Sequence, residues 1–213
     1  SSLPGDYNRV NTALAALAVL ATGVQPADVE RAIGAGASVP GRMERVELRS
    51  VVAGREPPWV YVDFAHTPEA VRATLEALRT TASGRVVAVI GAGGARDRTK
   101  RPLMGAAAAR AADLVVVTDD NPRDEDPAAI RADLAAGARH AGGDVVEIAG
   151  RSAAIAEALR RTGPGDVVAV LGRGHESHQE IAGEFRPLVD RDLVRAAWAA
   201  PETWTDTGRK ADE

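Results

Sequence analysis

The sequence predicts an α/β fold built on a mostly parallel sheet with helices on both faces. Two observations carry this prediction. Short, valine-rich apolar runs recur at residues 59–63, 86–90, 114–118 and 167–171, and helical stretches separate them along the chain. Each run is apolar throughout rather than alternating, which is typical of parallel strands that are covered on both sides.

The first expected element is a helix over residues 9–22, where Ala and Leu dominate and apolar side chains recur at helical spacing. Asn8 is expected to cap its N-terminus and Gly23 to end it. A second helix is expected over residues 26–35, because it opens with a proline, which suits a first helical turn. These helices have no sheet of their own to cover, and residues 39–42 (VPGR) indicate a boundary.

From residue 43 onward, strands and helices alternate. The remaining helices are expected at residues 68–80, 102–112, 127–141 and 151–162. One more strand is expected at residues 145–148, and flanking strands, for which an antiparallel orientation is considered, at residues 44–52 and 185–189. The polar tail after residue 200 is expected to be frayed.

Composition and charge exclude several classes of protein. A chain of 213 residues and 22.1 kDa favours one domain, or one domain with part of another. Its 26 basic and 30 acidic residues give a net charge of -4, which argues against a general nucleic-acid-binding surface. There is no cysteine, so disulfides, thiolate metal sites and cysteine nucleophiles are excluded. No apolar run reaches the roughly 18 residues needed to span a bilayer, and no signal peptide is recognised.

Each of the four apolar strands is followed by a loop dense in charged residues or glycine. These loops are residues 63–68 (DFAHTP), 91–102 (GAGGARDRTKRP), 119–127 (DDNPRDEDP) and 172–177 (GRGHES). Ligands of open α/β sheets bind outside the carboxyl ends of the strands, so the sequence predicts one cleft formed by all four loops. The competing interpretation, that such loops are polar in any case, suits any single loop better than all four together.

The glycines of residues 91–94 allow either a close backbone approach to a ligand or a tight turn. Their spacing matches neither the dinucleotide-binding G-x-G-x-x-G pattern nor a P-loop, and no other segment supplies a P-loop. A standard dinucleotide site and a self-contained P-loop ATPase are therefore excluded. The basic side chains that follow either form a solvated loop or neutralise a phosphate or carboxylate; they are Arg96, Arg98, Lys100 and Arg101.

Opposite charges meet in the next two loops. The Asn-Pro step after Asp120 predicts a turn that places Arg123 beside Asp120. A fixed cation beside a fixed anion suits a zwitterionic ligand, and Glu176 adds a second acid. The alternative is an internal Asp–Arg surface pair, which would contribute little stability.

No side chain is predicted to be catalytic in this chain. His66 and His175 are interpreted as hydrogen-bonded loop histidines, because neither has an obvious nucleophile to serve. The four histidines are scattered without a paired ligand spacing, so no metal site is predicted.

Taken together, these segments resemble the Mur ligase family. The matching blocks run in family order from Gly5 to Asp192. They are GDYNRVN (5–11), VPGRME (39–44), DFAHTP (63–68), GAGGARDRTKRPLMG (91–105), DDNPRDEDP (119–127), GDVVAVLGRGHE (165–176) and DRD (190–192). The ordered set is highly specific, and DNPR with GHE points to the branch that adds meso-diaminopimelate.

The resemblance implies three domains in the whole enzyme, of which this chain matches the end. Residues 1–38 would be the last helices of a central ATPase domain, residues 39–200 a Rossmann-like C-terminal domain, and residues 201–213 a disordered tail. The family uses ATP and Mg²⁺ to form an acyl phosphate, which the amine of the incoming amino acid attacks. The resemblance thus implies a cytoplasmic enzyme of peptidoglycan synthesis that joins meso-diaminopimelate to UDP-N-acetylmuramoyl-L-alanyl-D-glutamate. The P-loop, the modified lysine and the central Mg²⁺ ligands are missing from this chain, so we expect it to be inactive alone.

The resemblance also assigns two sets of site residues. Those on the nucleotide side are Asn8, Asn11, Arg42, Asp63, His66 and Lys100. Those that hold meso-diaminopimelate are Arg96, Asp120, Asn121, Arg123, Gly172 and Glu176. Lysine lacks the distal carboxylate of meso-diaminopimelate, so an arginine clamp could discriminate between the two amino acids.

Three residues depart from the family pattern. Ala95 stands where an acidic residue is usual, Thr99 where glycine is usual, and Arg173 where lysine is common. They put the local loop geometry in question but leave the amino-acid clamp in place. Two other functions stay open from the residues: a non-catalytic module that binds an amino acid or nucleotide, and a lysine-adding ligase of the same family.

Overall fold

A six-stranded sheet forms the centre of the computed structural model, which describes residues 4–36, 39–48 and 55–200. The strands are β1 (Glu44–Val46), β2 (Trp59–Asp63), β3 (Val86–Ile90), β4 (Leu114–Val117), β5 (Val145–Glu147) and β6 (Val167–Leu171), in the spatial order β1-β2-β6-β3-β4-β5. β1 pairs antiparallel with β2, and every other pairing is parallel. The predicted parallel sheet is therefore confirmed. Of the strand expected over 44–52, residues 44–46 are confirmed, residues 47–48 belong to no strand, and residues 49–52 lie outside the described ranges.

The register brings the ends of the four central strands to one level. Leu171 at the end of β6 pairs with Asp63 of β2 on one side and Ile90 of β3 on the other, and Ile90 pairs with Val117 of β4. The loops that follow these strands therefore emerge from one edge of the sheet, as the sequence predicts.

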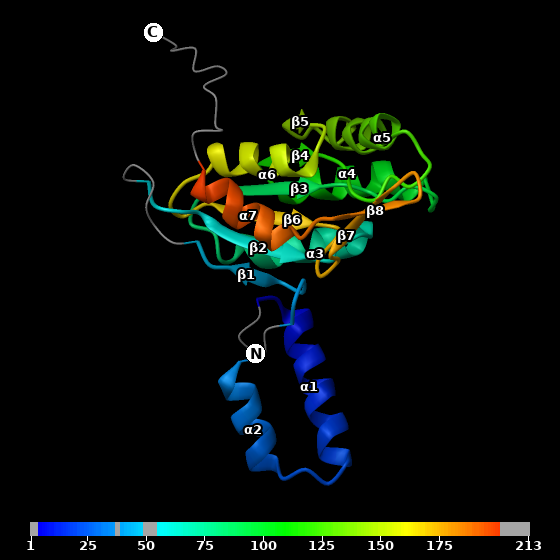
Figure 1. The fold of residues 1–213 in the computed structure, drawn as a ribbon. Helices are drawn as coiled ribbons and strands as arrows, with labels where there is room; N and C mark the ends of the chain where they lie inside the picture. The colour runs from blue at the N-terminus through cyan, green and yellow to red at the C-terminus, as the bar shows by residue number, and fades with distance from the viewer. Residues whose placement is uncertain (1–3, 37–38, 49–54, 201–213) are drawn as a thin grey trace.

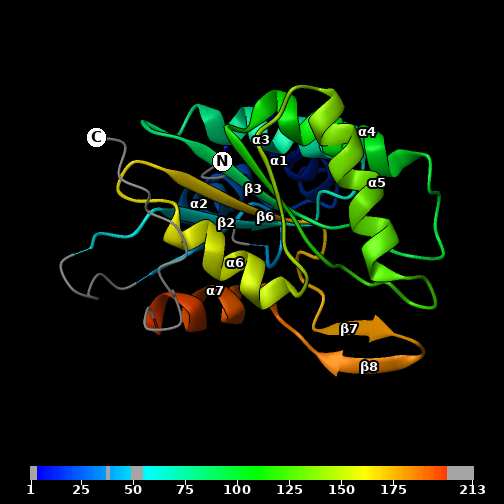
Figure 2. The same cartoon turned by 90° about the horizontal axis from the view of Figure 1, so that it is seen from above.

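Helices cover both faces of the sheet (Figure 2). One face carries α3 (Pro68–Arg79), α4 (Lys100–Ala111) and α5 (Pro127–His140), and the other carries α6 (Arg151–Arg160) and α7 (Asp190–Ala199). Leu75, Met104 and Leu134 are fully buried on the first face. Ile155 and Trp198 pack in the core of the second. Successive side chains of the central strands alternate between these two cores, which explains why the strands are apolar throughout.

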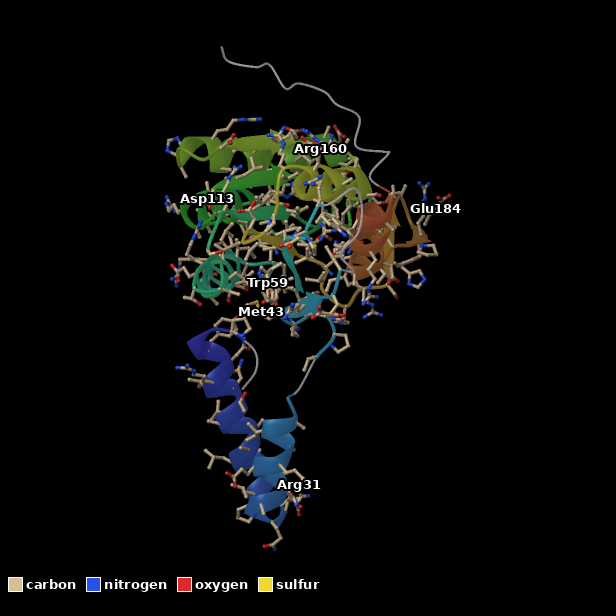
Figure 3. The ribbon with its side chains drawn as sticks, turned by 90° about the vertical axis from the view of Figure 1, so that its left-hand side faces the viewer. Arg31, Met43, Trp59, Asp113, Arg160 and Glu184 are labelled. Carbon is tan, nitrogen blue, oxygen red and sulfur yellow. The ribbon has the colours of Figure 1, made fainter. Side chains whose placement is uncertain are left out.

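Two helices form a hairpin that projects from this body (Figure 1). They are α1 (Asp6–Ala21) and α2 (Pro26–Ala35), close to the predicted ranges. The expected capping by Asn8 is wrong: Gly5 is the N-cap, and Asn8 lies inside the first turn, where its Nδ2 donates to the Pro4 carbonyl at 2.6 Å. Gly23 follows the helix end with a φ of +89°, as expected for a terminating glycine. Figure 3 shows Met43 where the hairpin meets the body, and Arg31 on α2 away from it.

A second hairpin and one helix were not expected in this form. β8 (Glu184–Pro187) does not flank the main sheet, as predicted for residues 185–189, but pairs antiparallel with β7 (His178–Ile181) in a separate two-stranded sheet. β7 reads HQEI, which lacks the apolar pattern of a strand. α7 had a signal that was missed, because acidic residues in its first turn precede Val194 and Trp198, which are one turn apart. No helix within the described ranges is both long and apolar enough to cross a bilayer.

Candidate functional site

Two hollows lie side by side at the edge where the four central strands end. The first, here called the strand-end pocket, has a volume of about 270 Å³ and is formed by the loops that follow β2, β3, β4 and β6. The second, here called the helix-side cleft, has about 560 Å³ and lies between α1, α3 and the loops around Arg42 and Asp63. Phe64 and His66 line both, so the two hollows share a wall.

The structure brings together in the strand-end pocket all six residues predicted to hold an amino acid. They are Arg96, Asp120, Asn121, Arg123, Gly172 and Glu176. Lys100, predicted for the nucleotide side, also lines this pocket rather than the cleft. The remaining predicted nucleotide-side residues, Asn8, Asn11, Arg42, Asp63 and His66, line the helix-side cleft.

Glycine is required at two positions of the pocket. A Cβ on Gly94 would lie 1.9 Å from the carbonyl oxygen of Pro122, so this glycine allows the loops after β3 and β4 to touch. Gly172 has a φ of +110°, and a Cβ there would lie 2.6 Å from Oδ2 of Asp120. Gly94 thus serves neither of the two roles considered from the sequence, a ligand approach or a tight turn, but close packing between two loops of the protein.

Arg123 is held in a strained backbone conformation with its guanidinium toward the pocket. Its φ is +53°, which a non-glycine residue adopts at a cost of about 1–2 kcal/mol. Nη1 donates to the Gly94 carbonyl at 2.7 Å, and Nε lies 3.0 Å from the Glu180 carboxylate. The surface pair with Asp120 considered from the sequence is not formed, because the carboxylate partner of Arg123 is Glu180 on β7. The backbone reinforces this docking, since the Arg123 N–H donates to the Glu180 carbonyl at 3.1 Å.

The acidic side of the pocket is organised by Arg173, a residue to which the sequence assigned no role. The Arg173 side chain is fully buried, and burial lowers the pKa of its guanidinium. Its Nη1 lies 3.5 Å from Glu176 and 4.0 Å from Asp120, and it donates to Oδ1 of Asn121 at 2.8 Å. Asn121 Nδ2 in turn donates to Glu176 at 2.7 Å. Two acids and an amide therefore face the pocket with a buried cation behind them.

The basic loop after β3 divides into structural and pocket-lining residues. Glu125 accepts from the Ala95 N–H at 2.6 Å and from Arg101 Nη2 at 2.9 and 3.0 Å, and Arg98 pairs with it at 3.0 Å. The bond from the Ala95 N–H is the largest of the effects that lower the pKa of Glu125. Arg98 and Arg101 thus fix the loop, while Arg96 and Lys100 line the pocket. Sequence reasoning missed Glu125, because its partners lie in another loop.

The departures at residues 95 and 99 fit this loop. Ala95 has a φ of +50°, and its N–H is the one bound by Glu125. Thr99 donates to Oδ1 of Asp97 from both its N–H, at 2.9 Å, and its hydroxyl, at 2.6 Å. The loop therefore closes on itself just before α4 begins at Lys100.

The carboxylate of Asp63, in the helix-side cleft, accepts hydrogen bonds from groups of the protein itself. Oδ2 accepts from the Met43 N–H at 2.7 Å, and Oδ1 accepts from the Ala65 N–H at 2.9 Å and the Thr74 hydroxyl at 3.2 Å. Burial raises the pKa of Asp63 above its ordinary value, and these bonds act in the opposite direction. Asp63 therefore fixes the loops that form the cleft walls.

The wall between the two hollows is built on Phe64. The Arg42 guanidinium lies 4.5 Å from the centre of the Phe64 ring, a cation–π distance. His66 Nδ1 donates to the Phe64 carbonyl at 2.8 Å, which agrees with the interpretation of His66 as a hydrogen-bonded loop histidine. Lys100 Nζ donates to the His66 carbonyl at 3.2 Å, which ties the two loops of this wall together.

A divalent metal ion would need several carboxylate or imidazole ligands in one place. Among the described residues, no three histidine, aspartate or glutamate side chains are grouped in that way. Those residues therefore do not fit a Mg²⁺ site on their own.

Comparisons with known proteins agree on one family. The family described as Mur ligase, glutamate ligase domain, matches residues 41–174. The UDP-N-acetylmuramoyl-L-alanyl-D-glutamate--2,6-diaminopimelate ligase of Streptomyces avermitilis is 47% identical over 201 residues, which cover 92% of this chain and 38% of that protein. A solved structure of a UDP-N-acetylmuramoyl-L-alanyl-D-glutamate--2,6-diaminopimelate ligase is 37% identical with a TM-score of 0.71, over 95% of this chain and 40% of the other.

A more distant solved structure is that of E. coli FolC in complex with ADP. It is 26% identical with a TM-score of 0.57, over 78% of this chain and 36% of the other. In all of these matches the chain spans well under half the length of the protein it resembles.

Proposed function

Because this chain belongs to the Mur ligase family, we propose that it is the C-terminal portion of a ligase that joins meso-diaminopimelate to UDP-N-acetylmuramoyl-L-alanyl-D-glutamate. ATP would transfer its γ-phosphoryl group to the acceptor carboxylate, which gives an acyl phosphate and releases ADP. The amine of the amino acid would then attack that carbonyl, forming the amide bond and releasing phosphate. This chain would supply the amino-acid site and part of the ATP site. The 47% identity to a ligase of that name supports this assignment.

The observation that carries the proposal is the charge pattern of the strand-end pocket. Two guanidinium groups, Arg96 and Arg123, and two carboxylates, Asp120 and Glu176, line a volume of about 270 Å³. The distal end of meso-diaminopimelate carries both a carboxylate and an ammonium group, whereas the distal end of lysine carries an ammonium group alone. Arg123, assisted by Arg96, would bind the carboxylate, and the two acids would bind ammonium groups. Lysine would leave the guanidinium without its carboxylate, a loss of about 2–4 kcal/mol.

The helix-side cleft is proposed as the nucleoside end of the ATP site. E. coli FolC, which is 26% identical to this chain, was solved in complex with ADP, and this supports a nucleotide site in a protein of this fold. Asn8, Asn11, Arg42 and His66 would contact the nucleotide from the cleft, with Asp63 bracing its wall. Lys100 would sit between nucleotide and amino acid, because it lines the strand-end pocket and bonds the His66 carbonyl.

The division of the chain follows from the same proposal. Residues 1–38 would be the last helices of a central ATPase domain, residues 39–200 would form the C-terminal domain, and residues 201–213 would be its tail. No segment of the sequence has the P-loop pattern that binds the β- and γ-phosphates. We therefore expect the purified 213-residue chain to hydrolyse no ATP above the rate of a heat-denatured control.

The test is the amino-acid dependence of ligation by the full-length protein that carries this chain. With ATP and the UDP-muramoyl dipeptide supplied, we expect formation of the tripeptide product from meso-diaminopimelate and at least 30-fold lower kcat/KM with L-lysine. Equal use of both amino acids would indicate a lysine-accepting ligase. The absence of product with either amino acid would indicate a non-catalytic binding module.

A further inference from the structure

Arg173 lies directly behind the strand-end pocket without lining it. Its side chain is fully buried, and its guanidinium faces three polar groups of the pocket loops: Asn121 Oδ1 at 2.8 Å, Glu176 at 3.5 Å and Asp120 at 4.0 Å. Arginine keeps its proton in proteins, so this is a permanent cation beneath the acids of the pocket. The position suits a residue that acts on a ligand only through its neighbours.

The first neighbour is Asn121, whose amide orientation Arg173 determines. Oδ1 of Asn121 receives two donors, Arg173 Nη1 at 2.8 Å and the Glu180 N–H at 2.9 Å. A reversed amide would turn its NH₂ group toward both of these donors. Nδ2 must therefore face the other way, where it donates to Glu176 at 2.7 Å. The orientation of the Glu176 carboxylate thus depends on Arg173 through one intervening side chain.

The second neighbour is the β7–β8 hairpin. Nη2 of Arg173 donates to the His178 carbonyl at 2.7 Å, where β7 begins, and to the Leu188 carbonyl at 3.3 Å, just after β8 ends. One end of a single guanidinium therefore holds both ends of the hairpin. The hairpin in turn carries Glu180, which pairs with Nε of Arg123 at 3.0 Å.

We propose that Arg173 is a positioning residue for amino-acid binding, which orients Asn121 and Glu176 from beneath and fixes Arg123 through the β7–β8 hairpin. This proposal rests on the function proposed above. Arg173→Gln removes the charge but leaves an amide that can still donate a hydrogen bond to Asn121, so the variant should fold. Arg173→Lys keeps the charge, and lysine is common at this position in the family, so its effect should be the smaller one.

The experiment uses the ¹⁵N-labelled 213-residue chain, titrated with meso-diaminopimelate and with L-lysine. Arg173→Lys should retain most of the affinity for meso-diaminopimelate. Arg173→Gln should weaken that binding about 10- to 100-fold, the loss expected when one charge-assisted hydrogen bond is removed. Its preference for meso-diaminopimelate over L-lysine should fall, and amide exchange of Glu180 and Ala182 should accelerate. The matched control is Arg186→Gln on β8, an exposed arginine paired with Glu184 at the outer edge of the body (Figure 3). It should leave both readouts unchanged.

A double-variant cycle tests whether Arg173 acts through Asn121. If it does, Arg173→Gln should weaken binding by a smaller factor in an Asn121→Ala background than in the wild type, and the remaining effect should come through the hairpin. Full additivity overturns the proposal, as does an Arg173→Gln variant that loses stability but keeps the affinity and preference of the wild type. If the wild type shows no preference for meso-diaminopimelate, the proposed function fails. The hairpin exchange rates then decide the positioning role alone: faster exchange in Arg173→Gln supports it, and unchanged exchange overturns it.

Discussion

Replacing Arg123 by alanine separates a ligand clamp from a structural arginine. In the free protein the substitution removes the hydrogen bond to the Gly94 carbonyl and the ion pair with Glu180. The side chains of Arg123 and Glu180 are 21% and 29% exposed. A charge-assisted bond contributes about 1.5–3 kcal/mol and a partly exposed pair up to about 1 kcal/mol. We therefore expect a loss of about 1.5–4 kcal/mol in the free energy of unfolding, measured by urea denaturation.

The effect on amino-acid binding should be additional to this loss of stability. Losing a bidentate contact with a carboxylate costs about 2–4 kcal/mol, so the KM for meso-diaminopimelate in the full-length enzyme should rise roughly 30- to 1000-fold. The KM for ATP should change little, and Arg123→Lys should rescue poorly. Arg72→Ala is the control, because Arg72 is exposed on α3, pairs with Glu76 on the same helix and does not line the pocket. A destabilised Arg123→Ala enzyme with an unchanged KM for meso-diaminopimelate would refute the clamp.

Three further predictions concern other parts of the body. Gly172→Ala should destabilise the chain by about 1–3 kcal/mol and raise the KM for meso-diaminopimelate, because its φ is +110° and the new Cβ would crowd Asp120; an unaltered KM would contradict this. Asp190→Asn should cost about 3–5 kcal/mol in urea unfolding, since it leaves the fully buried Arg151 without its charge partner at 2.7 Å, and a loss below 1 kcal/mol would be inconsistent with that. The arginine partners of Glu157 lower its pKa, so its contribution is present above its unfolded-state pKa and is lost as the pH falls through the folded-state value. Glu157→Gln should therefore cost about 0.5–1 kcal/mol at pH 7 and nothing in acid, as pH-dependent unfolding can show.

The sequence predicted the sheet well because its signal is local. Each central strand is a valine-rich run bounded by a polar loop, and the two cores explain why such runs are apolar on both faces. The same local reasoning missed β7, whose HQEI sequence is held in place by docking against Arg123 rather than by burial of apolar side chains. It also placed β8 at the edge of the wrong sheet, because pairing partners are not visible in one segment.

Which candidate site residues lie together depends on the register between neighbouring strands, which could not be predicted from the sequence. Asp63, Ile90 and Leu171 pair at one level, and that alignment turns four separate loops into two adjacent hollows. The resemblance named the pocket residues by motif, but it could not reveal the side chains behind them. Arg173 and Glu125 act through contacts between loops distant in sequence, so their roles became visible only in the fold.

The most direct test of the central claim is to map meso-diaminopimelate onto the 22.1 kDa chain by NMR. Backbone and side-chain resonances of the ¹⁵N-labelled protein would be followed during a titration into the millimolar range. We predict saturable shifts confined to the loops of the strand-end pocket, around Arg96, Asp120, Arg123 and Glu176, with much smaller shifts for L-lysine. Shifts of equal size for both amino acids, shifts centred on the helix-side cleft, or none at all would contradict the assignment of this pocket.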